Sequence, residues 1–183
     1  MSKPYSTVVF RDRIGALIGK KGAVKKRLEE ILGVMIIVDS ASGQVTVQET
    51  ESKVDKFMKA IDIIRAIEYG FSPERAERLL SDDYSLHVID LTAYVGKSDK
   101  AISRVKGRII GEEGRTRRVI EETASVDLSI YRHFIGMIGS YEGIVVASEA
   151  VKMLVSGSPH KSVYNYLFAE RRKKKMEKMD MWE

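Results

Sequence analysis

Two pairs of glycines in the sequence have the residue type and spacing that suit phosphate binding. Gly19 and Gly22 form the first pair, and Gly111 and Gly114 form the second. Glycines at this spacing let the backbone turn tightly, and they carry no Cβ atom that would keep a ligand at a distance. A helix that begins at such a turn presents unpaired N–H groups and the positive end of its dipole. The sequence therefore predicts two turns that a phosphate chain can approach closely.

Spacing alone is weak evidence, because 14 glycines in 183 residues give about one such pair by chance. Gly136 and Gly139 are such a pair; no basic helix follows them, and we interpret them as a strand end and turn. The other two pairs each follow an isoleucine and open a basic helix. Lys20 and Lys21 add positive charge to the first turn. These two turns are therefore the candidates for phosphate binding.

A nucleotide-binding P-loop is the competing interpretation of the first turn. The stretch from Gly15 to Lys20 resembles one. A P-loop, however, has four residues between its glycines and a Ser or Thr after its Lys. Here three residues separate Gly15 from Gly19, and Lys21 follows Lys20. Nucleotide hydrolysis is therefore not favoured.

The two turns occupy equivalent places in an internal repeat. Gly111 lies 92 residues after Gly19 (111 − 19), and 92 is close to half of the 183-residue chain. The same offset places Lys25 on Arg117, Lys26 on Arg118, Glu29 on Glu121 and Val34 on Val126. We infer that the chain contains two copies of one module.

Each copy contains the same order of predicted elements. β-Branched and aromatic runs predict strands, and apolar residues at helical spacing predict helices. In the first copy the predicted strands are 5–10, 34–38 and 45–47, and the predicted helices are 13–18, 23–32 and 52–68. In the second copy they are strands 86–91, 126–131 and 134–138, and helices 98–110, 115–123 and 144–155. We predict an α+β fold in which each copy packs a three-stranded antiparallel sheet on three helices.

The domain boundaries follow from these elements. We expect a first domain at 1–70, a linker helix at 71–83, a second domain at 84–157, and a C-terminal basic helix with its tail at 158–183. Ser72 and Pro73 suit the N-cap and the first position of the linker helix. The basic run 171–175 is either a solvated helical face or a tail that contacts phosphates, and the sequence leaves both open.

The Ile-Gly-x-x-Gly turn between two short helices, in a β-α-α-β-β-α unit, resembles the type I KH domain. The resemblance covers almost the whole chain, because both copies fit. It implies that about four single-stranded nucleotides lie in a groove, with the glycine turn against their backbone. The second strand of each copy would form the other wall of this groove, and Ile18 and Ile110 would form part of its floor.

The residues that this resemblance implies for RNA binding lie on both copies. In the first copy they are Ile18, Gly19, Lys20, Lys21, Gly22, Lys25, Lys26, Ile36 and Val38. In the second copy they are Arg108, Ile110, Gly111, Gly114, Arg115, Arg117 and Arg118, with Leu128 and Ile130 on the strand. We expect the first copy to supply the main backbone clamp.

A more specific resemblance comes from the order of the whole chain. Two KH units are followed by Gly157, Pro159, Val163 and Tyr164 and then by a basic helix. This is similar to the archaeal counterpart of the small-subunit pre-rRNA processing factor called partner of Nob. The resemblance implies a cytoplasmic protein that binds near the 3′ end of small-subunit (pre-)ribosomal RNA. It also implies three protein partners: the Nob endonuclease, the rRNA dimethyladenosine methyltransferase and the alpha subunit of archaeal initiation factor two.

The second turn departs from the KH pattern, because Glu112 and Glu113 stand where a KH loop usually carries a basic residue. An exposed carboxylate beside a phosphate costs about 1 kcal/mol. Arginines surround this turn and can outweigh the repulsion: Arg108, Arg115, Arg117 and Arg118. Two alternatives stay open: a KH protein that regulates mRNA, and a docking scaffold in which one KH fold no longer binds RNA.

Other chemistry has little support in the sequence. The absence of Cys excludes disulfides, thiol catalysis and Cys-bound zinc. His87, His133 and His160 lack metal-ligand spacing, so we expect no metal, no cofactor and no enzyme. No apolar run reaches the roughly 18 residues that span a membrane, and the N-terminus lacks the apolar segment of a signal peptide. The net charge of +5 permits an RNA partner without establishing one.

Overall fold

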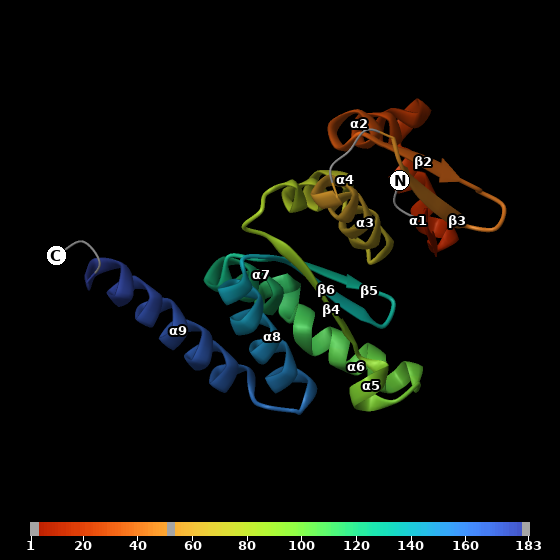
Figure 1. Ribbon diagram of the computed structural model, residues 1–183. Coiled ribbons are helices and arrows are strands. Elements are labelled where there is room, and N and C mark those ends of the chain that lie inside the picture. The colour runs from red at the N-terminus through yellow and green to blue at the C-terminus, as the bar shows by residue number, and fades with distance from the viewer. Residues whose placement is uncertain (1–3, 51–53, 181–183) are drawn as a thin grey trace. The chain divides into compact units, whose positions relative to one another are not determined.

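The computed structural model describes residues 4–50 and 54–180 (Figure 1). The chain divides into two compact units, Met1–Asp82 and Asp83–Glu183. None of the described helices is long and apolar enough to cross a membrane. Each unit is built around its own sheet.

The first unit packs a three-stranded antiparallel sheet against helices. Its strands are β1 (Tyr5–Val8), β2 (Val34–Val38) and β3 (Gln44–Glu49), and its helices are α1 (Arg11–Ile18), α2 (Ala23–Leu32), α3 (Val54–Glu68) and α4 (Pro73–Ala76). The strand order is β1-β3-β2, so β2 is an edge strand. A short 3-10 turn, Lys20–Gly22, connects α1 to α2.

Buried and exposed side chains alternate along the strands of this unit, and the buried ones belong to its hydrophobic core. Val34 and Ile36 of β2 are buried, whereas Met35 and Ile37 between and after them are about half exposed. Successive side chains of a strand point to opposite faces, so one face of β2 is turned to the helices and the other to solvent. Val47, which lies opposite Ile36 in the register, is also buried.

The second unit repeats this architecture and adds a long helix. Its strands are β4 (Ser85–Asp90), β5 (Asp127–Tyr131) and β6 (Phe134–Gly139), and its helices are α5 (Thr92–Val95), α6 (Asp99–Ile110), α7 (Arg115–Ala124), α8 (Tyr141–Val155) and α9 (His160–Asp180). The strand order is β4-β6-β5, so β5 is the edge strand. The 3-10 turn Glu112–Gly114 connects α6 to α7.

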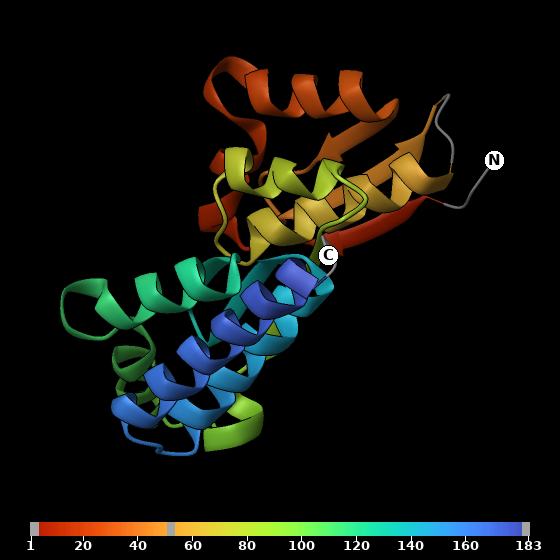
Figure 2. The ribbon, with the colours of Figure 1, turned by 90° about the vertical axis from the view of Figure 1, so that its left-hand side faces the viewer.

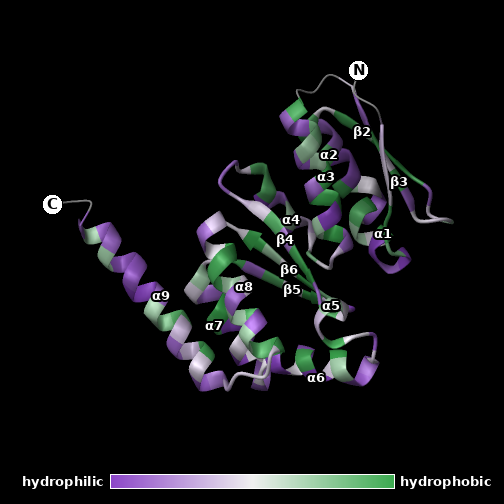
Figure 3. Ribbon diagram, turned by 60° about the horizontal axis from the view of Figure 1, so that its bottom comes forward, coloured by the Kyte–Doolittle hydropathy of each residue, from purple (hydrophilic) through white to green (hydrophobic). Residues whose placement is uncertain are grey.

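Helix α9 is only partly covered by the second unit. It lies against α7 and α8 (Figure 2), and Val163 and Leu167 from its first half join the hydrophobic core. Residues 171–180 of its second half are all exposed. This half is largely hydrophilic (Figure 3), so it has no apolar stripe to bury.

The predicted fold class is confirmed, and the differences are local. Strand β1 ends at Val8, earlier than expected, because the Val9 N–H donates to the Gly43 carbonyl (2.9 Å) where the chain turns into α1. Helix α5 was not predicted; the Asp90 carboxylate accepts the Thr92 N–H (2.8 Å) at its start. The first residues of the predicted helix 52–68 lie outside the described residues. The division into linker helix and C-terminal tail stays a prediction.

Candidate nucleic-acid interface

The two glycine turns have the same backbone conformation. φ and ψ are 74° and 175° at Gly19, and 72° and 176° at Gly111. The third residue of each turn is left-handed, with φ of 53° at Lys21 and 49° at Glu113. Helices α2 and α7 begin directly after the turns. Both turns therefore present their backbone in the same way, although their side chains carry opposite charge.

The lysines at the first turn are accessible to a ligand. Lys20 and Lys21 are exposed, and within the described part of the chain neither side chain has an ion pair or hydrogen bond. Lys26, on the first turn of α2, forms only a long exposed ion pair with Glu30 (3.9 Å). Such surface pairs contribute about 1 kcal/mol or less, so Lys26 can exchange Glu30 for a phosphate.

Lys25 and its repeat partner Arg117 have a different role, because each ties its helix to the edge strand. Lys25 Nζ lies 3.0 Å from Glu29 Oε1, and the same oxygen accepts the Ile36 N–H (2.8 Å). In the second unit the Arg117 guanidinium donates to the Leu128 carbonyl (2.8 Å). These two basic residues hold the groove walls together and have less charge to offer a ligand than Lys20 or Lys21.

The expected strand wall needs a correction. The side chain of Ile36 is 1% exposed and that of Leu128 is fully buried, because both point into the core. Their partners two residues later, Val38 and Ile130, are half-buried and are the strand residues that a base can reach. On the helix side Ile18 is half-buried, while Ile110 is 37% exposed. Ile36 and Leu128 therefore support the wall from beneath.

Arg108 also differs from the expectation that it is free to bind RNA. Its Nε donates to the Leu154 carbonyl at the end of α8 (3.1 Å), and its Nη2 donates to the Ser158 carbonyl. Arg13 makes the corresponding contacts in the first unit, from Nε to the Ile67 carbonyl (2.8 Å). Arg108 thus fixes the connection from α8 to α9, and only the outer part of its guanidinium remains available.

The two other arginines near the second turn are exposed. Arg118 Nη2 donates to the carbonyl of Glu113 (3.2 Å), which steadies the turn. Arg115 is exposed, and no described residue pairs with it. Glu112 and Glu113 are also exposed. Arg115 is therefore the predicted site residue of this unit with the most freedom to meet a ligand.

Sequence reasoning missed the contact that joins α9 to the second turn. Thr116 is 1% exposed, and its Oγ1 lies 2.8 Å from the Tyr164 hydroxyl. One turn earlier on α9, His160 Nε2 lies 2.9 Å from the Arg108 carbonyl oxygen. The only local sign was the spacing from Gly157 to Tyr164, which does not reveal its partners. Helix α9 is thereby a structural part of the second site.

We expect Tyr164→Phe to lower the free energy of unfolding of the second unit by about 1–2 kcal/mol, because it leaves the buried Thr116 hydroxyl without a partner. The double variant Thr116→Val, Tyr164→Phe should recover most of this loss, since Val24 fills the equivalent place in the first unit. Urea unfolding followed by circular dichroism measures both. A double variant no more stable than Tyr164→Phe would contradict this account.

Known proteins with similar sequences and structures agree with this geometry. A family model described as the eukaryotic type KH-domain (KH-domain type I) matches residues 85–172, and a KH domain model matches residues 5–63. A KH domain-containing protein of Methanocaldococcus jannaschii is 45% identical over 174 residues, which are 94% of this chain and 76% of that protein. A crystal structure of an a/eIF2alpha-aDim2p-rRNA complex from Pyrococcus horikoshii OT3 contains a chain that is 41% identical, with a TM-score of 0.88 and coverage of 93% of this chain and 95% of that one.

This chain belongs to the PNO1/Dim2 family of KH-domain proteins. A eukaryotic relative, the pre-rRNA-processing protein pno1 of Schizosaccharomyces pombe, is 28% identical over 140 residues. These cover 75% of this chain and 58% of the yeast protein, so the PNO1/Dim2 similarity spans little more than half of that relative. Membership in the PNO1/Dim2 family confirms the KH resemblance, while the individual RNA-binding residues stay a prediction.

Proposed function

We propose that this chain binds single-stranded RNA near the 3′ end of small-subunit (pre-)ribosomal RNA and acts there in ribosome assembly or rRNA processing. The observation that carries the proposal is the pair of glycine turns with equal backbone geometry, each opening a basic helix. A KH turn of this kind holds the sugar–phosphate backbone of about four nucleotides. Two such turns in one chain suit a run of unpaired RNA.

The residues of the first unit divide into two roles in this proposal. Lys20, Lys21 and Lys26 contact phosphates, because their amino groups are exposed and have weak partners or none among the described residues. Ile18 and Val38 are half-buried and offer apolar surface to the bases. Phosphate contacts hold the strand without reading its sequence, so specificity rests on the apolar surface and on base edges.

The comparisons support the ribosomal target. The crystal structure from Pyrococcus horikoshii is described as a complex of aDim2p with a/eIF2alpha and rRNA, and the yeast relative is named for pre-rRNA processing. We extend both to this chain: ribosomal RNA is its ligand and the alpha subunit of initiation factor two is a partner. We propose that the protein works in the cytoplasm of an archaeal cell.

Binding is the whole activity that we propose. Among the described residues, no cluster of three or more His, Asp or Glu side chains could hold a metal ion. The feature that the two units share is a glycine turn suited to holding a ligand, and binding of this kind needs no nucleophile or general base. Cleavage of a ribosomal RNA precursor is then the task of a separate enzyme that this protein positions.

A titration combined with crosslinking tests the function. The purified chain should bind a fluorescent single-stranded oligonucleotide of the small-subunit rRNA 3′ sequence and bind the same sequence more weakly once it is paired to its complement. RNA crosslinked to the protein in cells should be enriched in small-subunit rRNA precursors. Recovery of messenger RNA without ribosomal RNA would overturn the ribosomal assignment, and absence of binding to any single strand would overturn RNA binding itself.

A further inference from the structure

The two KH units carry their positive charge at different places around the glycine turn. At the two loop positions, Lys20 and Lys21 correspond to Glu112 and Glu113. At three flanking positions only the second unit has an arginine: Asp12 corresponds to Arg104, Ala16 to Arg108 and Ala23 to Arg115. The cations Arg11 and Arg13 of the first unit correspond to Ser103 and Val105. The second unit therefore lacks the loop cations of the first and carries three arginines around its turn that the first unit does not have.

The three arginines surround an open hollow beside the second turn. It has a volume of about 470 Å³, and its polar lining is Arg104, Arg108, Arg115, Thr116, His160 and Tyr164. We call this feature the arginine hollow. Helix α9 contributes His160 and Tyr164, so the hollow depends on an element that follows the KH core. Glu112 is the one carboxylate in its lining.

The walls of the arginine hollow are fixed, while its outer cations are free. Arg108 is held by carbonyl groups at the end of α8, and Thr116 and Tyr164 are held by their mutual hydrogen bond. Arg104 and Arg115 are exposed, and no described residue forms an ion pair or hydrogen bond with either side chain. Guanidinium groups in this state can form two parallel hydrogen bonds to a phosphate.

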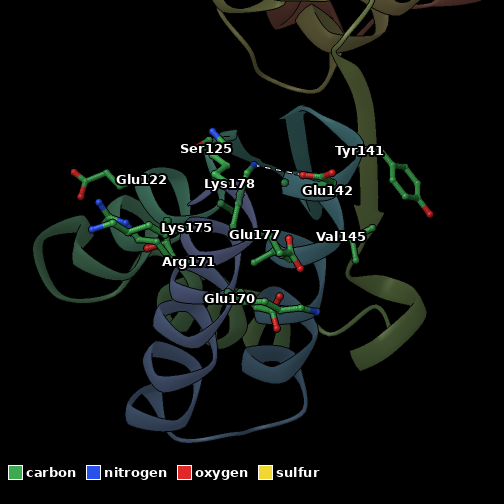
Figure 4. A pocket seen from close by; sticks show the side chains of 16 residues that line it. Glu122, Ser125, Tyr141, Glu142, Val145, Glu170, Arg171, Lys175, Glu177 and Lys178 are labelled. Atoms are coloured by element: carbon green, nitrogen blue, oxygen red, sulfur yellow. Dashed lines mark ion pairs between the residues drawn. The ribbon is translucent and has the colours of Figure 1, made fainter. Parts of the chain in front are cut away.

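The larger hollow of this unit has a different character. It has a volume of about 660 Å³ and lies between the ends of α7, α8 and α9 (Figure 4). Its basic residues from α9 alternate with Glu122, Glu142, Glu170 and Glu177, and Lys174 pairs with Glu142 (3.5 Å). Opposite charges in one hollow offset each other, so it lacks the preference for a polyanion that the arginine hollow has.

We propose that the arginine hollow binds phosphodiester groups of single-stranded RNA at the second KH unit, in place of the missing loop lysines. This rests on the proposed function and adds a location for the strand. The RNA backbone passes the glycine turn on the side of α6 and α9, where Arg104 and Arg115 meet successive phosphates. Glu112 is the single carboxylate in the lining, where three arginines outnumber it, and Glu113 is not part of the lining, so the negative charge of the turn is tolerated.

The test neutralises the two free arginines in a protein whose first site is already disabled. In the full chain carrying Lys20→Asp and Lys21→Asp, residual binding of the 3′ rRNA oligonucleotide reports on the second unit. Adding Arg104→Gln and Arg115→Gln removes two phosphate contacts. For a single strand each contact contributes about 0.7 to the slope of log K against log salt, so the slope should fall by about 1.4 and affinity at 0.1 M salt by about 25-fold.

The matched control changes two other exposed cations of the same unit, Lys97→Gln and Lys152→Gln, which line neither hollow. This pair should leave both slope and affinity unchanged, and Arg104→Lys with Arg115→Lys should retain most of the slope. Unchanged thermal unfolding of all variants shows that folding is intact. The proposal for the arginine hollow is overturned if residual binding is the same with and without the two glutamine substitutions. It is also overturned if the Lys20→Asp, Lys21→Asp protein shows no residual binding at all. In either case, RNA binding by the wild-type chain would still support the proposed function.

Discussion

Replacing Lys20 and Lys21 together by Asp is expected to weaken binding of the single-stranded 3′ rRNA oligonucleotide to the first KH unit by about 700-fold at 0.1 M salt. Loss of two phosphate contacts accounts for about 25-fold of this change. Two carboxylates placed beside the RNA backbone add repulsion of about 1 kcal/mol each, which is the remaining factor of roughly 30. Both lysines are exposed and form no contact with a described residue, so the change should leave the fold intact.

Fluorescence anisotropy across a salt series measures this effect, with the second unit weakened by Arg104→Gln and Arg115→Gln to isolate the first. The charge-matched control is Lys97→Asp with Lys152→Asp, two exposed cations of the second unit whose side chains, like those of Lys20 and Lys21, form no contact with a described residue. Lys20→Arg with Lys21→Arg should retain binding, because the charge is kept. Affinity that survives both aspartates would remove the first turn from the RNA-binding site.

The glycine turns could be predicted from the sequence because their conformation depends on neighbouring residues. Gly19 and Gly111 adopt backbone angles that only glycine enters readily, and the basic helices follow at once. The roles of Ile36 and Arg108 could not be predicted in the same way. A strand pattern predicts which residues share a face but not how deeply each of them is covered, so Ile36 was expected in the groove wall although it is buried beneath Val38 on the same face.

Contacts between distant residues explain the other differences. Arg108 bonds to carbonyls 46 and 50 residues later in the chain, and Thr116 meets Tyr164 across 48 residues. Nothing in the local sequence of α6 distinguishes an arginine that fixes a helix end from one that binds phosphate. The arginine hollow could not be predicted for the same reason: its lining residues His160 and Tyr164 are distant from the glycine turn in sequence and reach it only because α9 packs against the second unit.

The first glycine of the second turn is the residue at which we expect a small substitution to cost most stability. Gly111 has φ of 72° and ψ of 176°, a region that other residues avoid at a cost of about 1–3 kcal/mol. A Cβ atom there would also lie 2.8 Å from the Thr116 Cβ and backbone N, and closer still to Oγ1. The Thr116 side chain cannot move away from the added Cβ atom, because it is buried and hydrogen-bonded to Tyr164.

Gly111→Ala should therefore lower the free energy of unfolding of the second unit by about 4 kcal/mol, from backbone strain and overpacking together. Gly114→Ala is the matched control: its φ of 74° and ψ of 14° are left-handed, but nothing lies within 4 Å of the added Cβ. That variant should lose only about 1–2 kcal/mol. Urea unfolding followed by circular dichroism separates the two. Equal losses would show that left-handed strain alone sets the need for glycine, and that the contact with Thr116 contributes nothing.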